Sequence, residues 1–378
     1  MEDPPPPPEP EHHHRPVRFG ILGCAAIARK LARAIRLVPG ATIAAVGSRS
    51  ESKARRFISE NGLDGAAVRA HGSYEALLDD PGVDAVYAPL PTGLHARWAA
   101  AAAARGKHVL LEKPAAPCAA DLDAILAACD AAGVQFMDGT MLMHHPRTHE
   151  MRNIIADKKA FGDVRMINSV LSFRVSDDFL QNDIRVKPEL DGLGALGDIG
   201  WYCVRAILWA VGYELPTTVA ALPGSVTKND AGVVLACGAS MRWAGSKVVA
   251  TFTCSFLASL AMDLTVVGTN GTLRVTDLVI PLEERSAGFS VVATPAMAEL
   301  AVGWGPPPAE VAVATDLPQE ALMVQEFARL VRSVRDDGGR PEGKWPAIAR
   351  KTQAVLDAVK ASIDKGCEPI EIMQGLNN

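Results

Sequence analysis

The chain has 378 residues, and its 38 Lys and Arg against 43 Asp and Glu give a formal net charge of -5 at pH 7. This mildly acidic balance, without a basic stripe, argues against nucleic acid as a partner. The length suffices for two domains. No apolar run is long and pure enough to cross a bilayer, so we expect a cytoplasmic protein without a membrane partner.

The seven cysteines are scattered, and no two of them have CxxC spacing. This pattern favours reduced thiols over a disulfide framework or a zinc site. Histidines and carboxylates are also too dispersed along the chain to indicate a bound metal. We therefore predict no metal centre.

The first 15 residues are rich in proline and acidic side chains, and they contain three successive histidines. Proline favours extended chain without internal hydrogen bonds, so residues 1–15 are predicted to be a disordered tail. The next segment, 16–140, alternates short apolar runs with helical patterns. This alternation predicts parallel βαβ units and a doubly wound domain of the Rossmann type. The strands are expected at 17–22, 42–47, 83–89, 108–112 and 134–138.

Residues 141–378 have a different pattern. Several β-rich runs follow a helix expected over 192–212, and Asn270-Gly271 is a strong hairpin signal. We expect an α+β domain built on a large, mostly antiparallel open-faced sheet, which would bind substrate and form dimers. Residues 283–316 are interpreted as a long irregular loop. The two closing helices could pack back on the first domain.

The stretch GILGCAAIARK follows the first predicted strand and places small residues at the positions of a GxGxxG fingerprint. Gly23 suits the tight turn, and Ala25 lets the backbone approach a pyrophosphate. Small residues also suit any tight turn from strand to helix. The position at the first such turn of a doubly wound sheet favours a nucleotide site that includes Ala26 and Ile27.

The end of the second strand predicts which nucleotide binds. NAD-binding proteins use an acidic residue there to accept from the ribose 2′-OH. This chain has Ser48 and Arg49 instead, and Lys53 follows. A hydroxyl and two cations suit a 2′-phosphate, so NADP(H) is predicted in preference to NAD(H), which stays possible.

Several motifs together resemble the Gfo/Idh/MocA oxidoreductase family. They are FGILGCAAIARK, GSRSESKA, LLEKPAAP, GALGDIGWYCVRAI and VVGTNGTLRV. Within the family the chain looks closest to the branch of glucose-fructose oxidoreductase, dimeric dihydrodiol dehydrogenase and D-xylose dehydrogenase, and to plant members. Cys118 stands where the family often has Asn. The resemblance implies a homodimer formed through the second sheet, because an exposed apolar sheet face needs a cover.

The resemblance also places Lys113, Asp198 and Tyr202 around the reacting carbon of the substrate and implies a cis bond between Lys113 and Pro114. Asp198 and Tyr202 are four residues apart, so they share one helix face. Asp198 is also a candidate helix N-cap. A tyrosine with a pKa near 10 is a poor base at neutral pH. We expect the ammonium of Lys113 to lower the pKa of Tyr202, which would make this tyrosine the acid/base.

Other residues have weaker assignments. Cofactor contacts implied by the resemblance are Pro91, Thr92, His95, Glu112 and Lys113. His95 has a second interpretation as a partner at a helix start. His144 and Arg147 are candidates for the substrate pocket, with a structural role at the domain junction as the alternative.

The leading hypothesis is an NADP-dependent enzyme that acts on a secondary alcohol or carbonyl of a sugar, polyol or cyclic diol. One alternative is a non-catalytic NADP(H)-binding sensor on the same fold. Another is a reductase of a different substrate class, such as a tetrapyrrole reductase.

Overall fold

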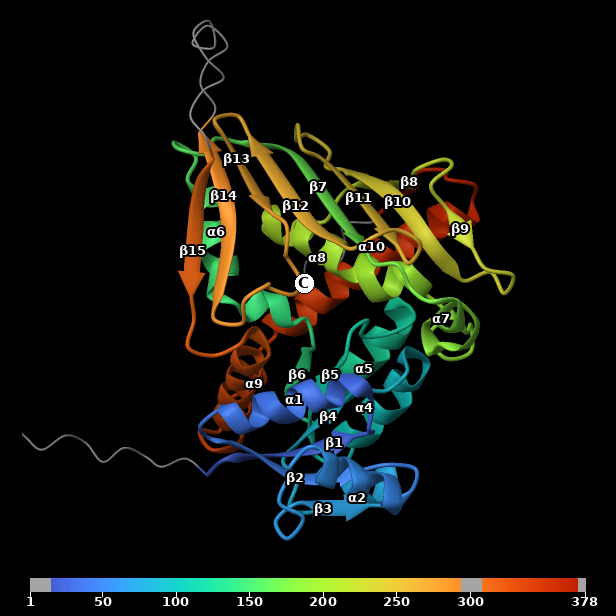
Figure 1. The fold of residues 1–378 in the computed structure, drawn as a ribbon, viewed down its shortest axis with the longest axis vertical. Helices are drawn as coiled ribbons and strands as arrows, with labels where there is room; N and C mark the ends of the chain where they lie inside the picture. The colour runs from blue at the N-terminus through green and yellow to red at the C-terminus, as the bar shows by residue number, and fades with distance from the viewer. Residues whose placement is uncertain (1–14, 294–307, 373–378) are drawn as a thin grey trace, which may run out of the picture.

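The structure is a computed structural model that describes residues 15–293 and 308–372. Its strands form two sheets, a parallel one and a larger, mostly antiparallel one, in the lower and upper halves of the molecule (Figure 1). The predicted fold class is therefore confirmed. The predicted tail at 1–15 lies outside the described residues except for Arg15.

The first sheet has six parallel strands in the order β3-β2-β1-β4-β5-β6. The central strands are buried on both faces, as expected for a parallel sheet between helices. The sequence did not reveal the third strand, which has only three residues. The six strands are β1 (Val17–Leu22), β2 (Ala41–Gly47), β3 (Arg69–His71), β4 (Ala85–Ala88), β5 (His108–Leu111) and β6 (Phe136–Asp138).

Helices connect these strands, and the burial pattern of the first helix shows why such helices form. α1 (Ala26–Leu37) buries Leu31 and Ile35 against the sheet and exposes arginines on its other side. α9 (Gln319–Arg335), near the end of the chain, packs against α1. The remaining helices of this half are α2 (Glu51–Glu60), α3 (Tyr74–Leu78), η1 (Thr92–Leu94), α4 (His95–Ala103), α5 (Ala119–Ala131) and η2 (Met141–His144).

The second sheet has ten strands in the order β15-β14-β13-β12-β7-β11-β10-β8-β16, with β9 paired to β10. All its pairs are antiparallel except β7 with β11. Its strands are β7 (Val164–Ser172), β8 (Thr218–Ala221), β9 (Thr227–Lys228), β10 (Val234–Arg242), β11 (Val249–Ser255), β12 (Ala261–Gly268), β13 (Gly271–Val275), β14 (Ser286–Ala293), β15 (Ala309–Ala314) and β16 (Ile370–Glu371).

Two predictions about this sheet have different outcomes. The hairpin at Asn270-Gly271 is confirmed, because β12 and β13 pair across it. The interpretation of 283–316 as an irregular loop is wrong, because β14 and β15 form an antiparallel pair there. The connection between them, at 294–307, lies outside the described residues.

Helices cover the inner face of the second sheet. α8 (Trp201–Ala210) packs on β7 and β11, and α10 (Lys344–Asp364) packs on α8, β8 and α5. α10 therefore contacts both halves of the molecule (Figure 1). The remaining helices are α6 (Pro146–Ala156), α7 (Asp177–Asn182), η3 (Ile184–Val186) and η4 (Leu196–Gly200). No helix within the described residues is long and apolar enough to cross a membrane.

Candidate active site

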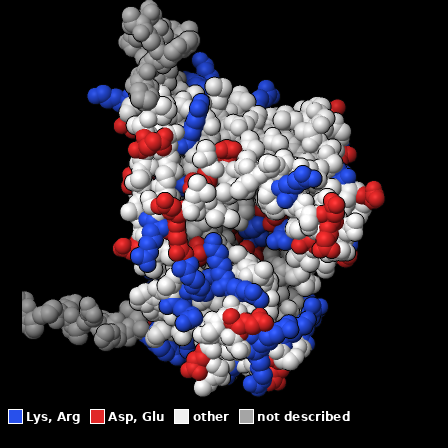
Figure 2. Space-filling view, viewed as in Figure 1, with Lys and Arg blue, Asp and Glu red and all other residues white. Residues whose placement is uncertain are grey.

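A cavity of about 430 Å³ lies where the two halves meet. The segments that follow β1, β4 and β5 all contribute to its wall, as expected for a doubly wound sheet that binds ligands beyond the carboxyl ends of its strands. Figure 2 shows the surface hollowed between the two halves, with charged side chains of both signs at the hollow. The volume of this cavity suits a small ligand bound next to the reactive ring of a nucleotide.

The turn after β1 can accept a pyrophosphate. Gly23 has φ of +113°, and an added Cβ there would lie 3.2 Å from Leu90, so a side chain at this position is strained. Ala25 precedes α1, whose first turn has neither a side-chain cap nor an acidic residue. The first amides of the helix are therefore available to an anion. Ala25 and Ile27 line the cavity, and Ala26 is exposed beside them.

The residues after β2 lie beside this turn. The thiol of Cys24 is 3.9 Å from the carbonyl oxygen of Lys53. Arg49 is exposed and acts electrostatically on Tyr74, whose hydroxyl lies near Gly23. Ser48 is buried at the strand end. The structure therefore brings Arg49 and Lys53 to the edge of the predicted phosphate turn.

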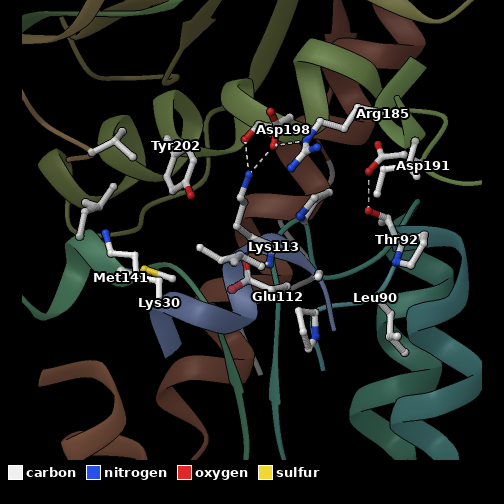
Figure 3. Close-up of a pocket in the computed structure, with 18 of the residues that line it drawn as sticks. Lys30, Leu90, Thr92, Glu112, Lys113, Met141, Arg185, Asp191, Asp198 and Tyr202 are labelled. Atoms are coloured by element: carbon white, nitrogen blue, oxygen red, sulfur yellow. Dashed lines mark hydrogen bonds and ion pairs between the residues drawn. The ribbon is translucent and has the colours of Figure 1, made fainter. Parts of the chain in front are cut away.

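Lys113 follows β5 and reaches across the cavity to the other half of the molecule (Figure 3). Its ammonium donates to the Asp198 carboxylate at 2.6 Å and to the Asp198 backbone carbonyl at 2.8 Å. It also lies 4.8 Å from the centre of the Tyr202 ring. Burial lowers the pKa of Lys113, but Asp198 and Tyr202 outweigh burial and raise it above its ordinary value. Lys113 is therefore a permanent cation. The bond between Lys113 and Pro114 is cis.

Asp198 is not the N-cap of a helix. It lies within η4, a turn of π-helix that runs directly into α8, and its carboxylate bonds to side chains. Besides Lys113, it pairs with the Arg185 guanidinium at 3.0 Å. Burial raises the pKa of Asp198, and the two cations more than reverse this, so its pKa falls below the ordinary value. A carboxylate held by two cations is a poor base, so Asp198 orients Lys113.

Tyr202 lies one helical turn beyond Asp198 and lines the same cavity. Burial raises its pKa to about 12, although Lys113 acts in the lowering direction. Lys113 therefore acts on the pKa of Tyr202 in the expected direction, but burial is the larger effect and the net pKa is raised. At neutral pH the phenol keeps its proton.

Thr92 and Glu112 are buried in the wall of the cavity, and Pro91 also lines it. Glu112 accepts from the Tyr87 hydroxyl at 2.6 Å and from the Lys113 backbone N–H at 3.2 Å. Burial raises the pKa of Glu112. The Glu112 carboxylate therefore stabilises the backbone that carries Lys113.

Among the predicted site residues, His95, Arg147 and His144 do not line the cavity. His95 is fully buried, with its ring nitrogens 2.9 and 3.2 Å from the carbonyl oxygens of Leu90 and Ala115. It joins two loops and corresponds to the structural interpretation. Arg147 is buried and pairs with Asp277. His144 stacks on Trp345, with ring centres 4.6 Å apart. Neither side chain lines the cavity, and their contacts correspond to the structural role that was the alternative.

Cys118 is also outside the cavity wall. It precedes α5, and its thiol lies 3.4 Å from the Asp121 carboxylate.

Sequence reasoning missed three charged residues in the cavity, Lys30, Arg185 and Asp191. Lys30 lies on α1, whereas Arg185 and Asp191 come from the segment between α7 and η4, which contains η3. No local motif indicates which side chains of such a segment turn inward. Only the length of this segment and its distance from the predicted strands could have indicated that it contributes to the site.

Comparison with known proteins identifies the family. Residues 17–140 match the "Oxidoreductase family, NAD-binding Rossmann fold" of GFO/IDH/MocA proteins, and residues 148–274 match the GFO/IDH/MocA C-terminal domain. The chain belongs to this family of oxidoreductases. The predicted family and enzyme class are therefore confirmed.

The names of individual relatives also describe oxidoreductases. The chain is 42% identical over 188 residues to D-xylose 1-dehydrogenase (NADP(+)) 2 of Haloferax volcanii, and the match spans 50% of this chain and 55% of that protein. It is 33% identical to dTDP-3,4-didehydro-2,6-dideoxy-alpha-D-glucose 3-reductase of Streptomyces violaceoruber, over 92% of this chain and 95% of the relative. A 3-ketoreductase from Actinomadura kijaniata, solved with NADP and TDP-benzene, superposes with a TM-score of 0.77 at 26% identity, over 92% of this chain and 98% of that one.

Proposed function

We propose that this protein is an NADP(H)-dependent oxidoreductase that interconverts a secondary alcohol and a carbonyl on a sugar, polyol or cyclic diol. The observation that carries the proposal is the meeting of Lys113, Asp198 and Tyr202 in one cavity beside a turn suited to a pyrophosphate. The relatives support it, since their names describe a xylose dehydrogenase and a sugar ketoreductase, and two of them name NADP.

When bound, the nicotinamide cofactor supplies or accepts the hydride. The protein supplies the proton and the charge. The phenol of Tyr202 donates its proton to the carbonyl oxygen as that oxygen gains negative charge. The ammonium of Lys113 stabilises the developing charge, and Asp198 holds the ammonium in place. Because Tyr202 is protonated at neutral pH, the form present there is the one that donates a proton in the reductive direction.

Among the structures similar to this one are variants of the Actinomadura kijaniata ketoreductase in which a tyrosine was replaced by phenylalanine or a lysine by alanine. Residues of these two types carry the mechanism proposed for this chain.

The direct test combines binding and turnover. NADPH fluorescence titration of the wild-type protein would be followed by a panel of sugars, polyols, cyclic diols and their ketones. Tyr202→Phe should bind NADPH normally and lose turnover by roughly 100-fold or more. Tyr213→Phe, at a tyrosine outside the cavity, is the matched control and should stay active. Full activity of Tyr202→Phe would contradict the acid role. Tight NADPH binding without turnover would favour the sensor.

We also propose that the protein forms a homodimer through the outer face of the second sheet. On this face Met166 and Val249 are 56% and 45% exposed, and no helix among the described residues covers it (Figure 1). Light scattering after size exclusion measures the mass directly, and a monomer would contradict this proposal.

A further inference from the structure

Asp191 is a carboxylate that the mechanism does not use. It lines the cavity, and only 6% of the residue is exposed. The other carboxylate from this half of the molecule, Asp198, has two cations beside it. Over residues 15–293 and 308–372, Asp191 has no ion pair. A buried carboxylate without a counter-charge is costly, so its surroundings must offer hydrogen-bond donors.

The protein itself offers few donors. The Thr92 hydroxyl donates to one oxygen of Asp191 at 2.7 Å. The Leu193 backbone N–H donates to the other at 3.4 Å, which is a long bond. An ionised carboxylate has about four acceptor positions on its two oxygens. Asp191 therefore keeps unused acceptor capacity at the cavity.

The position of Asp191 relates its unused acceptor capacity to the reaction. In Figure 3 Tyr202 and Asp191 lie to either side of Lys113, with Arg185 between Lys113 and Asp191. Thr92 belongs to the nucleotide-binding half, and the neighbouring Gly93 N–H donates to the Leu190 carbonyl at 2.8 Å. Asp191 is thus fixed at the seam between the two halves, on the opposite side of the lysine from the proton donor.

We propose that Asp191 is a specificity-determining residue that accepts a hydrogen bond from a ligand hydroxyl adjacent to the reacting carbon. The inference rests on the proposed function and names the substrate class more closely. A substrate with a vicinal diol would place one oxygen at Tyr202 and Lys113 and the second at Asp191. A ribose hydroxyl of the cofactor is a second source of the same group, and the experiment separates the two.

The experiment measures equilibrium binding, so that it does not depend on turnover. The probes are trans-1,2-cyclohexanediol and cyclohexanol, each titrated into the NADP+ complex, together with NADPH titrated alone. Each is measured with the wild-type protein, Asp191→Asn and Asp191→Ala. The asparagine variant keeps the shape and the acceptor for Thr92 but removes the charge, and circular dichroism checks that both variants are folded.

A substrate contact predicts that the wild-type protein binds the diol more tightly than the mono-alcohol. It also predicts that the alanine variant loses roughly 10- to 100-fold in affinity for the diol and little for the mono-alcohol. General structural damage would weaken both probes equally. A selective loss of NADPH affinity would assign the hydroxyl to the cofactor.

Equal affinity of the wild-type protein for the two probes, with unchanged NADPH binding in the variants, would overturn the role of Asp191. Preference for the diol without any oxidation would count against the proposed function alone.

Discussion

Replacing Asp138 with alanine would leave a buried arginine without its counter-charge. Asp138 ends β6, and its carboxylate lies 3.1 Å from the guanidinium of Arg205 on α8, with both side chains fully buried. Arg205 also donates to the Thr352 hydroxyl at 2.7 Å, on α10. This cluster therefore joins the parallel sheet to the helix that carries Tyr202.

The expected cost follows from burial. Removing one partner of a fully buried ion pair typically costs about 3–5 kcal/mol of unfolding free energy, because the remaining charge is desolvated and unpaired. We expect this range for Asp138→Ala, since Arg205 is fully buried. Asp163→Ala is the control. Its carboxylate is 61% exposed and pairs with Arg165 at 3.3 Å, so the loss should be about 0–1 kcal/mol.

Urea unfolding followed by tryptophan fluorescence measures both variants. Trp201 is a suitable reporter because the Arg205 guanidinium lies 5.1 Å from its ring centre. The double variant Asp138→Ala with Arg205→Met should recover much of the lost stability, since it no longer buries a charge. An Asp138→Ala protein within about 1 kcal/mol of wild type, or a double variant less stable than the single one, would refute the reasoning.

Two further predictions concern the active site. Arg49→Ala should weaken NADPH by roughly 10- to 100-fold and NADH little, because only NADPH carries the 2′-phosphate; Arg36→Ala, at the far end of α1, is the control, and equal losses for both nucleotides would contradict the assignment. The rate of ketone reduction should stay level from neutral pH to about pH 10 and fall only as Tyr202, with its pKa of about 12, loses its proton. A fall centred near pH 8 in a stopped-flow profile at saturating NADPH would show that the phenol ionises far earlier than its burial implies.

The sequence alone was sufficient for features that rest on local patterns. Alternating strands and helices predicted the parallel sheet, and Asn270-Gly271 predicted a hairpin, which β12 and β13 form. Gly23 marked the tight turn after the first strand, where its φ is positive. The family motifs singled out Lys113 and Tyr202, which the structure places 4.8 Å apart as ammonium and ring centre.

Only the tertiary structure decided the environment of these groups. The pKa of Tyr202 rises because segments distant in the chain partly bury it, and no local pattern records that burial. Arg185 and Asp191 enter the site from an irregular segment, and their direction depends on contacts such as that between Asp191 and Thr92, which are 99 residues apart in the chain. Periodicity and turn chemistry act over a few residues, whereas desolvation and ion pairing depend on which distant segments meet. The elements were therefore predictable, and the electrostatics of the site were not.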